Sequence, residues 1–236
     1  MSPLSSGDPT LSLSGIDLFQ DLSGPELEAI GKLCQWKRYA RSQQIIGDQD
    51  QSSNVFFIID GEVRTAIYSP SGKEVSLRDL GRGKSIGELS AIDGAPRSAN
   101  VTALTNAVLA SMPATVFRTV LRDYPEVSKR MTFYLVDLVR KLSDRVVEFS
   151  VLAVRNRIHA ELLRLARQQG AAGSSARLSP APTHVDIANR VATHREAVTR
   201  ELNVLAKSGL LEKQPGALFI PDIAALEVLV NEGFER

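Results

Sequence analysis

The sequence predicts an α+β protein with a β-rich domain first, a long helix next and a small helical domain last. From Trp36 to about Met112, short apolar or β-branched runs alternate with turn residues at intervals of roughly ten positions, which is typical of short antiparallel strands. Beyond Pro125 the apolar residues recur at helical spacing, and no Gly or Pro occurs before Gly170. The predicted parts are a disordered tail at 1–14, a β domain at 15–124, a helix with its hinge at 125–152, and a helical domain at 153–236.

Composition and charge exclude several classes of protein. The 236 residues are 43% hydrophobic and 23% charged, which is ordinary for a globular protein with a core. Lys plus Arg number 28 and Asp plus Glu 27, which excludes a polybasic nucleic-acid tail and an acidic tail but not DNA binding by a small local surface. The single cysteine, Cys34, rules out an intrachain disulfide, and an iron–sulfur cluster needs about four thiolates. With no apolar run of about 18 residues and no secretory signal, we expect a cytoplasmic protein that does not bind membranes.

A short helix is predicted between the tail and the β domain. The first 14 residues are rich in Ser, Pro and Gly, which is typical of a mobile chain end. Ser23 can cap the helix that follows, and Pro25 suits its first turn. The apolar positions at helical spacing are Leu27, Ile30 and Leu33.

Turn residues divide the next segment into predicted hairpins. Asp60-Gly61 separates Val55–Ile59 from Val63–Tyr68, and Ser71-Gly72 separates that second run from Val75–Leu77. Gly81 and Gly83 add another turn. Such tight turns join antiparallel strands, so the segment is predicted to form a small antiparallel roll or barrel. The turn signals alone do not choose between the two.

The long helix carries an apolar stripe that needs a partner. Its members recur at intervals of three and four residues, which is close to a heptad repeat: Met131, Leu135, Leu138, Leu142, Val146 and Phe149. The stripe could pack on the β domain of its own chain or on a second copy. We favour a homodimer through residues 131–149, because the stripe is long and follows a complete domain.

The last domain begins with a helical segment after Ser150. The stretch 170–182 is predicted to be a loop, because it is rich in Gly, Ser and Pro. Two short helices then follow, each opening with a predicted capping box, at Thr183-x-x-Asp186 and Thr193-x-x-Glu196. Apolar runs on either side of Gln214-Pro-Gly predict a small β hairpin.

The two short helices have the spacing of a helix-turn-helix. The residues predicted to face inward are Ile187, Ala188, Val191, Val198, Leu202 and Leu205. The polar residues that begin the second helix, and that would meet DNA, are Thr193, His194, Arg195, Glu196, Thr199 and Arg200. Arginine matches two acceptors of guanine, and glutamate can accept from cytosine. Alternatively, Glu196 and Arg200 are an ordinary surface pair four residues apart.

A second group of polar residues surrounds a predicted short helix in the β domain. Gly87 precedes the helix, so backbone N–H groups there can face an anion. Glu88 can accept a hydrogen bond from a ribose hydroxyl, while Arg97 and Ser98 can donate to a phosphate. Alternatively, Glu88 and Arg97 form a surface salt bridge.

Two motifs carry a resemblance to a known family. The stretch GKSIGELSAIDGAPRSANVTA resembles the phosphate-binding cassette of the cyclic-AMP receptor protein (catabolite activator, CRP/FNR) family of bacterial transcription regulators. The stretch THREAVTRELNVLAKSGLLE resembles the recognition helix and wing of the same family. The resemblance implies an N-terminal jelly-roll-like β roll that binds a cyclic nucleotide, a long dimerisation helix and a C-terminal winged helix-turn-helix.

The resemblance also implies roles for the cassette residues. Glu88 would bind the ribose 2′-hydroxyl, with the backbone of Gly87 beside it, and Arg97 and Ser98 would bind the cyclic phosphate. Leu89 and Ala99 complete the expected nucleotide site within the cassette. The family has a Thr-Ser pair on the dimerisation helix that reaches the adenine amino group, and the aligned pair here is Leu142-Ser143. Because leucine cannot bond that amine, we expect cyclic GMP as well as cyclic AMP to be an effector.

In the recognition helix, Arg195, Glu196 and Arg200 match the base-reading positions of the family. The resemblance implies a palindromic TGTGA-type DNA site, allosteric control by the nucleotide through the hinge near residues 149–155, and contact with RNA polymerase. We expect no catalytic residues, metal or prosthetic group, and therefore no enzyme. The alternative is a regulator of the same family that is nucleotide-independent or responds to redox state or nitric oxide.

Overall fold

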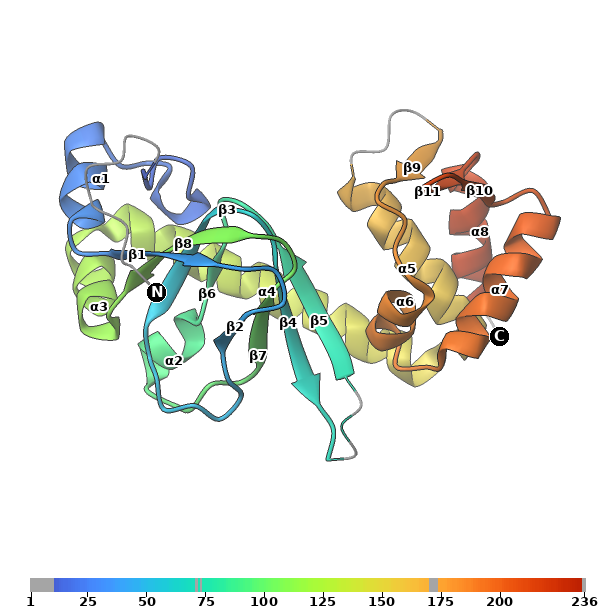
Figure 1. Cartoon of the computed structure of the whole chain (residues 1–236), viewed down its shortest axis with the longest axis horizontal. Helices are drawn as coiled ribbons and strands as arrows, with labels where there is room; N and C mark the ends of the chain where they lie inside the picture. Colours follow the sequence, from blue (N-terminus) through green and yellow to red (C-terminus); the bar gives the residue numbers. More distant parts are fainter. Residues whose placement is uncertain (1–10, 71, 73, 170–173, 235–236) are drawn as a thin grey trace. The chain divides into compact units, whose positions relative to one another are not determined.

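The computed structural model describes residues 11–70, 72, 74–169 and 174–234. A β-rich part that also contains short helices comes first, the long helix α4 (Pro125–Val151) follows, and a mainly helical part comes last (Figure 1). The chain forms two compact units that divide within α4, between Leu138 and Val139. The first half of α4 packs on the core of the first unit through Met131 and Leu135, and the predicted domain boundaries stay a prediction.

The first unit contains two antiparallel four-stranded sheets, and it confirms the predicted α+β class. One sheet has the order β1-β8-β3-β6 and consists of β1 (Gln35–Tyr39), β8 (Ala107–Met112), β3 (Val55–Asp60) and β6 (Ser85–Ile86). The other has the order β2-β7-β4-β5 and consists of β2 (Gln44–Ile46), β7 (Asn100–Ala103), β4 (Val63–Tyr68) and β5 (Glu74–Leu80). Every residue from Val55 to Ile59 in β3 is buried.

The hairpin predicted at Asp60-Gly61 is wrong, although the chain does turn there. The two strands that this turn joins, β3 and β4, belong to different sheets. Gly61 has φ of +86°, and a Cβ atom there would lie 2.5 Å from the Asn106 carbonyl oxygen. The turn therefore needs glycine to pass the chain between the sheets. For the hairpin predicted at Ser71-Gly72, the flanking strands β4 and β5 are neighbours in one sheet, as expected, while Ser71 itself lies outside the described residues.

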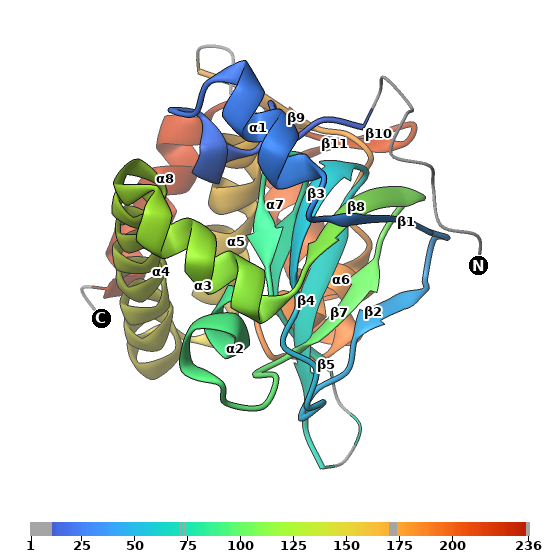
Figure 2. The same cartoon turned by 90° about the vertical axis from the view of Figure 1, so that its left-hand side faces the viewer.

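Helices cover one side of this unit, as Figure 2 shows for α1 (Gly24–Gly31), α3 (Ala114–Asp123) and α4. They enclose a core in which the Phe57 ring lies 4.9 Å from that of Phe19 and 6.3 Å from that of Phe117. Of the predicted tail, residues 1–10 lie outside the described part. The tail prediction is wrong at Leu13, which is only 2% exposed because it packs in this core.

The apolar stripe predicted on α4 is divided between two environments. Met131 and Leu138 are buried, at 3% and 9% exposed, and Leu135 packs on the core of the first unit. For these residues, the alternative of packing on the β domain of their own chain is therefore correct. The apolar side chains that remain exposed on α4 form a different stripe, which we call the outer face: Phe133, Val136, Val139, Leu142, Val146, Val147 and Val151.

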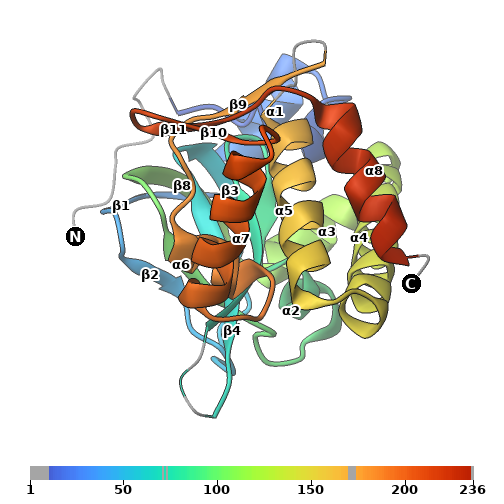
Figure 3. The same ribbon diagram turned by 90° about the vertical axis from the view of Figure 1, so that its right-hand side faces the viewer.

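The second unit is a helix-turn-helix with a three-stranded sheet (Figure 3). Its helices are α5 (Val154–Gln168), α6 (His184–Arg190), α7 (Arg195–Lys207) and α8 (Ile223–Phe234), and its strands are β9 (Ala176–Leu178), β10 (Glu212–Gln214) and β11 (Ala217–Ile220). The residues predicted to face inward on α6 and α7 are confirmed, because each is at most 3% exposed. Within the described ranges, no helix is long and apolar enough to cross a membrane.

Three local predictions in this unit have different outcomes. The capping box at Thr183 is confirmed, because its hydroxyl oxygen accepts from the Asp186 N–H at 3.0 Å. The box at Thr193 is wrong: α7 begins one residue later, with His194 as its N-cap, after a turn in which Ala192 has φ of +53°. Within the predicted loop at 170–182, residues 170–173 lie outside the described part, and residues 176–178 form β9 by pairing with β11.

Candidate functional site

The predicted anion site begins at a backbone position that only glycine fits. Gly87 lies between β6 and the short helix α2 (Glu88–Asp93), with φ of +82°. A Cβ atom at this position would lie 2.5 Å from Arg97 Nη1 and 2.9 Å from the Asn54 carbonyl oxygen. The close approach of the backbone to Arg97 therefore depends on the missing side chain.

Arg97 is held in the protein interior by three hydrogen bonds. The residue is 2% exposed. Its Nε donates to Ser52 Oγ at 3.2 Å, its Nη1 to the Gly87 carbonyl at 2.9 Å and its Nη2 to the Asn54 carbonyl at 2.7 Å. Because a guanidinium has five N–H groups, two remain for another acceptor. Two N–H groups of one fixed cation are suited to an anion with two oxygens, such as a phosphate.

Glu88 has one satisfied and one unsatisfied oxygen. The residue is 3% exposed, and its Oε1 accepts from the Tyr134 hydroxyl at 2.9 Å. Its Oε2 is buried and has no hydrogen-bond partner. Burial raises the pKa of Glu88, against the opposing effects of its own backbone N–H, Tyr134, Arg78 and Arg97. A buried acceptor without a partner is costly, so Oε2 is a place where a ligand hydroxyl would be stabilised.

Glu88 and Arg97 therefore do not form the surface salt bridge that was the alternative. Both side chains are buried and bond to other groups. Leu89 is 39% exposed, Ser98 is exposed and Ala99 is half-buried. The sequence did not predict Tyr134 as a neighbour of Glu88, since no local spacing relates positions 46 residues apart. It did not predict Arg78 there either, because Arg78 lies on a separate strand.

The predicted base-reading pair lies on α4, in the second unit. Leu142 is 49% exposed and belongs to the outer face. Ser143 is exposed, and its hydroxyl donates to the Val139 carbonyl in the preceding turn at 3.0 Å. The contact of this pair with a nucleotide base stays a prediction.

Most of the predicted DNA-contact residues lie exposed at the start of α7. His194, Arg195, Glu196 and Arg200 are all exposed. Thr193 differs from them, because it is 8% exposed, and its N–H donates to the Ala188 carbonyl in the turn at 2.9 Å. Its contact with DNA stays a prediction. Among the residues that the structure describes, Glu196 and Arg200 form no ion pair with each other, so the surface-pair alternative has no support.

Thr199 has internal partners as well. Its hydroxyl donates to the Arg195 carbonyl at 2.9 Å and lies 2.7 Å from His184 Nδ1 on α6. Burial and the charges of Lys213 and Arg195 lower the pKa of His184. The lowered pKa favours the neutral form of His184 beside the two cations Lys213 and Arg195.

Comparisons with known proteins match both units. The model of the cyclic nucleotide-binding domain matches residues 36–124, and that of the Crp-like helix-turn-helix domain matches residues 156–229. The chain belongs to the CRP/FNR family. Members of this family are DNA-binding transcription regulators and not enzymes, and this member carries a cyclic nucleotide-binding domain.

The similarity of this CRP/FNR regulator to its relatives covers almost the whole chain. It is 27% identical to the CRP-like cAMP-activated global transcriptional regulator of Mycobacterium tuberculosis, over 91% of this chain and 96% of that protein. It is 28% identical to the cyclic AMP receptor protein of Thermus thermophilus, over 91% and 97% respectively. The crystal structure of the Thermus thermophilus catabolite activator protein matches with a TM-score of 0.53 and 26% identity, over 92% and 99%.

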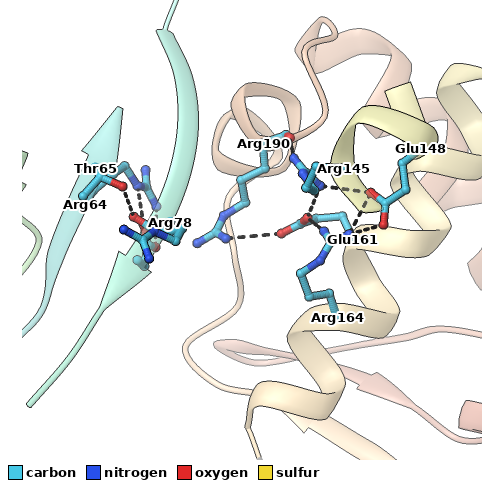
Figure 4. A network of polar contacts seen from close by, with 9 residues as sticks. Arg64, Thr65, Arg78, Arg145, Glu148, Glu161, Arg164 and Arg190 are labelled. Carbon is cyan, nitrogen blue, oxygen red and sulfur yellow. Dashed lines mark hydrogen bonds and ion pairs between the residues drawn. The ribbon is translucent and has the colours of Figure 1, made fainter. Parts of the chain in front are cut away.

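The CRP/FNR regulator also contains a buried ionic cluster where α4 meets α5. The Glu161 side chain is 2% exposed and forms ion pairs with Arg145 at 3.3 Å, Arg190 at 3.2 Å and Arg164 (Figure 4). Glu148 on α4 forms ion pairs with Arg164 at 2.6 Å and with Arg145 at 3.3 Å. The cluster joins the end of α4, the helix α5 and the end of α6.

Figure 4 also draws a separate contact of the first unit. The carbonyl of Arg78 on β5 accepts from the Thr65 hydroxyl on β4 at 3.2 Å.

The environment of Cys34 is relevant to the redox-responsive alternative. The residue is 9% exposed, and burial raises its pKa to about 12. The thiol is therefore protonated at neutral pH, whereas redox-sensing cysteines react as accessible thiolates. Cys34 in this CRP/FNR regulator has the properties of a core residue.

Proposed function

We propose that the protein is a homodimeric transcription regulator that binds cyclic AMP, and also cyclic GMP, in its first unit and then binds a palindromic TGTGA-type DNA site. The unpaired, buried Oε2 of Glu88, with the fixed guanidinium of Arg97 nearby in the cassette, carries this proposal. Arg97 and Ser98 bind the cyclic phosphate, and Glu88 accepts from the ribose 2′-hydroxyl. The backbone of Gly87, Leu89 and Ala99 lines the same site. The relatives from Mycobacterium and Thermus, which are named for cyclic AMP, support this effector.

We propose that the outer face of α4 is the dimer interface. Its seven apolar side chains are each at least 43% exposed, which is a large apolar surface for one helix to leave in water. Their spacing of mainly three and four residues suits packing against the same helix of a second copy. We therefore propose the outer face, at 133–151, in place of the stripe at 131–149, since Met131 and Leu138 of that stripe are buried within their own chain.

We expect the weak discrimination between cyclic AMP and cyclic GMP to result from Leu142. Substituting Leu142 by threonine supplies a hydroxyl that can bond the adenine amino group, and one such bond contributes a net of about 0.5–1.5 kcal/mol. We expect the ratio of cyclic AMP to cyclic GMP affinity to rise by about 2- to 10-fold in calorimetric titrations. Leu142→Val is the matched control, because it changes the shape without adding a donor or acceptor. An unchanged ratio in the threonine variant would refute the role of this position in base selection.

We propose that α7 reads DNA through Arg195, Glu196 and Arg200, with His194 on the phosphate backbone. Replacing Arg200 by alanine should cost about 1–3 kcal/mol of binding and relax specificity at a single base pair. The measurement is a titration of the variant with duplexes that differ from the TGTGA site at one position each. A loss that is uniform across these duplexes would instead identify Arg200 as a phosphate contact.

The proposed mechanism is linkage between the two sites. A nucleotide that binds the DNA-competent dimer more tightly shifts the population toward it, and DNA must then tighten nucleotide binding by the same factor. The break between α4 and α5 at Leu152–Ala153, within the predicted hinge, supports movement at this point. The DNA-bound dimer would contact RNA polymerase. The relatives are bacterial transcription regulators, and the bacterial chromosome lies in the cytoplasm, which is the compartment we propose.

Calorimetric titration with cyclic AMP and, separately, cyclic GMP tests the proposal. Micromolar binding of both nucleotides, followed by nucleotide-dependent binding of a TGTGA duplex, is the expected result. Binding of one nucleotide alone would mean that a residue other than Leu142 reads the base. If neither nucleotide binds, the nucleotide-independent regulator is the correct alternative.

A further inference from the structure

A hydrogen-bonded chain of three side chains ends at Glu88. Arg78 Nη1, from β5, donates to the Tyr134 hydroxyl oxygen at 3.1 Å, and the Tyr134 hydroxyl donates to Glu88 Oε1 at 2.9 Å. Arginine has no acceptor, so the bond from Arg78 has one possible direction. The tyrosine oxygen therefore accepts from Arg78, and its single proton is directed to Glu88.

The rest of the Tyr134 side chain is fixed by packing. Tyr134 lies on α4 and packs on the core of the first unit, whereas its neighbour Phe133 is 63% exposed on the outer face. The Arg78 guanidinium carbon also lies 5.9 Å from the centre of the Tyr134 ring. A hydroxyl held by a packed ring is a rigid donor, so it restricts how the Glu88 carboxylate can turn.

We propose that Tyr134 is a positioning residue of the nucleotide site: it holds Oε1 of Glu88 so that Oε2 is presented to the ribose 2′-hydroxyl. This inference rests on the proposed function of the first unit. It also places a residue of the proposed dimerisation helix one hydrogen bond away from the group that would bind the ribose. Occupancy of the ribose site is thereby linked to the first half of α4, independently of the base-reading pair at Leu142-Ser143.

The same bond affects the charge of Glu88. The groups that face the carboxylate are Tyr134 from α4, Arg78 from β5 and Arg97 from the segment after α2, and all three lower the pKa that burial raises. Burial and the Glu88 charge raise the pKa of Tyr134 to about 12, so the tyrosine stays a neutral donor. Because hydrogen bonds to an ionised carboxylate are the stronger kind, the charged form of Glu88 binds a hydroxyl better.

The test is the substitution Tyr134→Phe, with affinities measured for cyclic AMP and for 2′-deoxy cyclic AMP. In the unsubstituted protein the deoxy compound leaves Oε2 unpaired, and we expect it to bind about 10- to 100-fold more weakly. In Tyr134→Phe the carboxylate is no longer held. We expect cyclic AMP affinity to fall about 10-fold and the preference over the deoxy compound to shrink by at least about 3-fold.

A pH series separates positioning from a general loss of structure. Removing the Tyr134 hydroxyl removes a bond that favours the ionised form, so the pKa of Glu88 rises further. Affinity for cyclic AMP should therefore start to fall at a higher pH in Tyr134→Phe than in the unsubstituted protein, as acid protonates Glu88. Tyr124→Phe, the same chemical change elsewhere in the first unit, should leave both the preference and the pH profile unchanged.

The outcomes distinguish this inference from the proposed function. If the unsubstituted protein binds cyclic AMP but Tyr134→Phe keeps its affinity, its preference over the deoxy compound and its pH profile, the positioning role is overturned and nucleotide binding stands. If the unsubstituted protein binds neither compound, the proposed function fails and the inference fails with it. Arg78→Gln acts on the same chain from β5 and should change the preference in the same direction, which keeps the test decisive if Tyr134→Phe does not fold.

Discussion

Substituting Arg97 by alanine is expected to lower the affinity for cyclic AMP by at least about 100-fold. The two N–H groups of Arg97 that remain free would form charge-assisted bonds with the cyclic phosphate, and each such bond contributes about 1.5–3 kcal/mol. Their combined loss is therefore about 3 kcal/mol or more, which corresponds to the expected change in affinity. Calorimetric titration of the variant with cyclic AMP measures it.

The same substitution should also destabilise the first unit. The carbonyl oxygens of Gly87 and Asn54 each lose the Arg97 donor, although the Gly87 carbonyl still accepts from the Ala91 N–H at 3.4 Å. A buried acceptor that loses its donor costs about 1–3 kcal/mol. Urea unfolding followed by the fluorescence of Trp36, the single tryptophan, measures this effect, since Trp36 is 5% exposed in the core of the first unit. The calorimetric titrations must therefore be made in buffer in which the unfolding measurement shows the variant to be folded.

Arg118→Ala is the matched control for Arg97→Ala. Arg118 Nη1 donates to the Ala91 carbonyl of α2 at 2.6 Å, so it too is an arginine that bonds the backbone of the cassette. We expect the control to lose stability but to change cyclic AMP affinity by less than about 3-fold, because it removes no bond to the ligand. Equal losses of affinity in both variants, or unchanged affinity in Arg97→Ala, would contradict the phosphate role of Arg97.

Substituting Glu161 by alanine is expected to destabilise the second unit by about 3–5 kcal/mol, the effect of removing one member from a buried ionic group. Glu161 is an ion-pair partner of Arg145, Arg164 and Arg190. Without it, the three arginines lose the carboxylate that they share, and Glu148 remains as a partner of Arg145 and Arg164. The contacts that join the end of α4 to α5 and α6 would weaken together.

The measurement compares two probes of urea unfolding. Trp36 fluorescence reports on the first unit, whereas far-ultraviolet circular dichroism also reports on the helices of the second unit. In Glu161→Ala, we expect the dichroism to show an early transition that the fluorescence does not. Glu227→Ala is the control, because its pair with Arg167 is 46% and 57% exposed and such pairs contribute about 0–1 kcal/mol. Equal effects of the two substitutions would refute the importance of the buried cluster.

The sequence by itself determined the features that depend on neighbouring residues. Turn residues located the chain reversals, the helical period located α4, and the capping pair Thr183 and Asp186 located the start of α6. The short motif around Gly87 and Arg97 identified the cassette, because the residues that form it lie within one short stretch of chain. The same local signals did not identify which strand pairs with which, so the turn at Asp60-Gly61 was predicted to close a hairpin.

Only the tertiary structure decided which groups from distant segments meet. It divided the apolar stripe of α4 between a buried side and the outer face, and buried Thr193 in the turn before α7. It brought Tyr134 and Arg78 to Glu88, and three arginines to Glu161. The physical reason is that local sequence fixes backbone preferences and hydrogen bonds within a few residues, whereas sheet pairing and buried polar contacts are fixed by how whole apolar surfaces pack together.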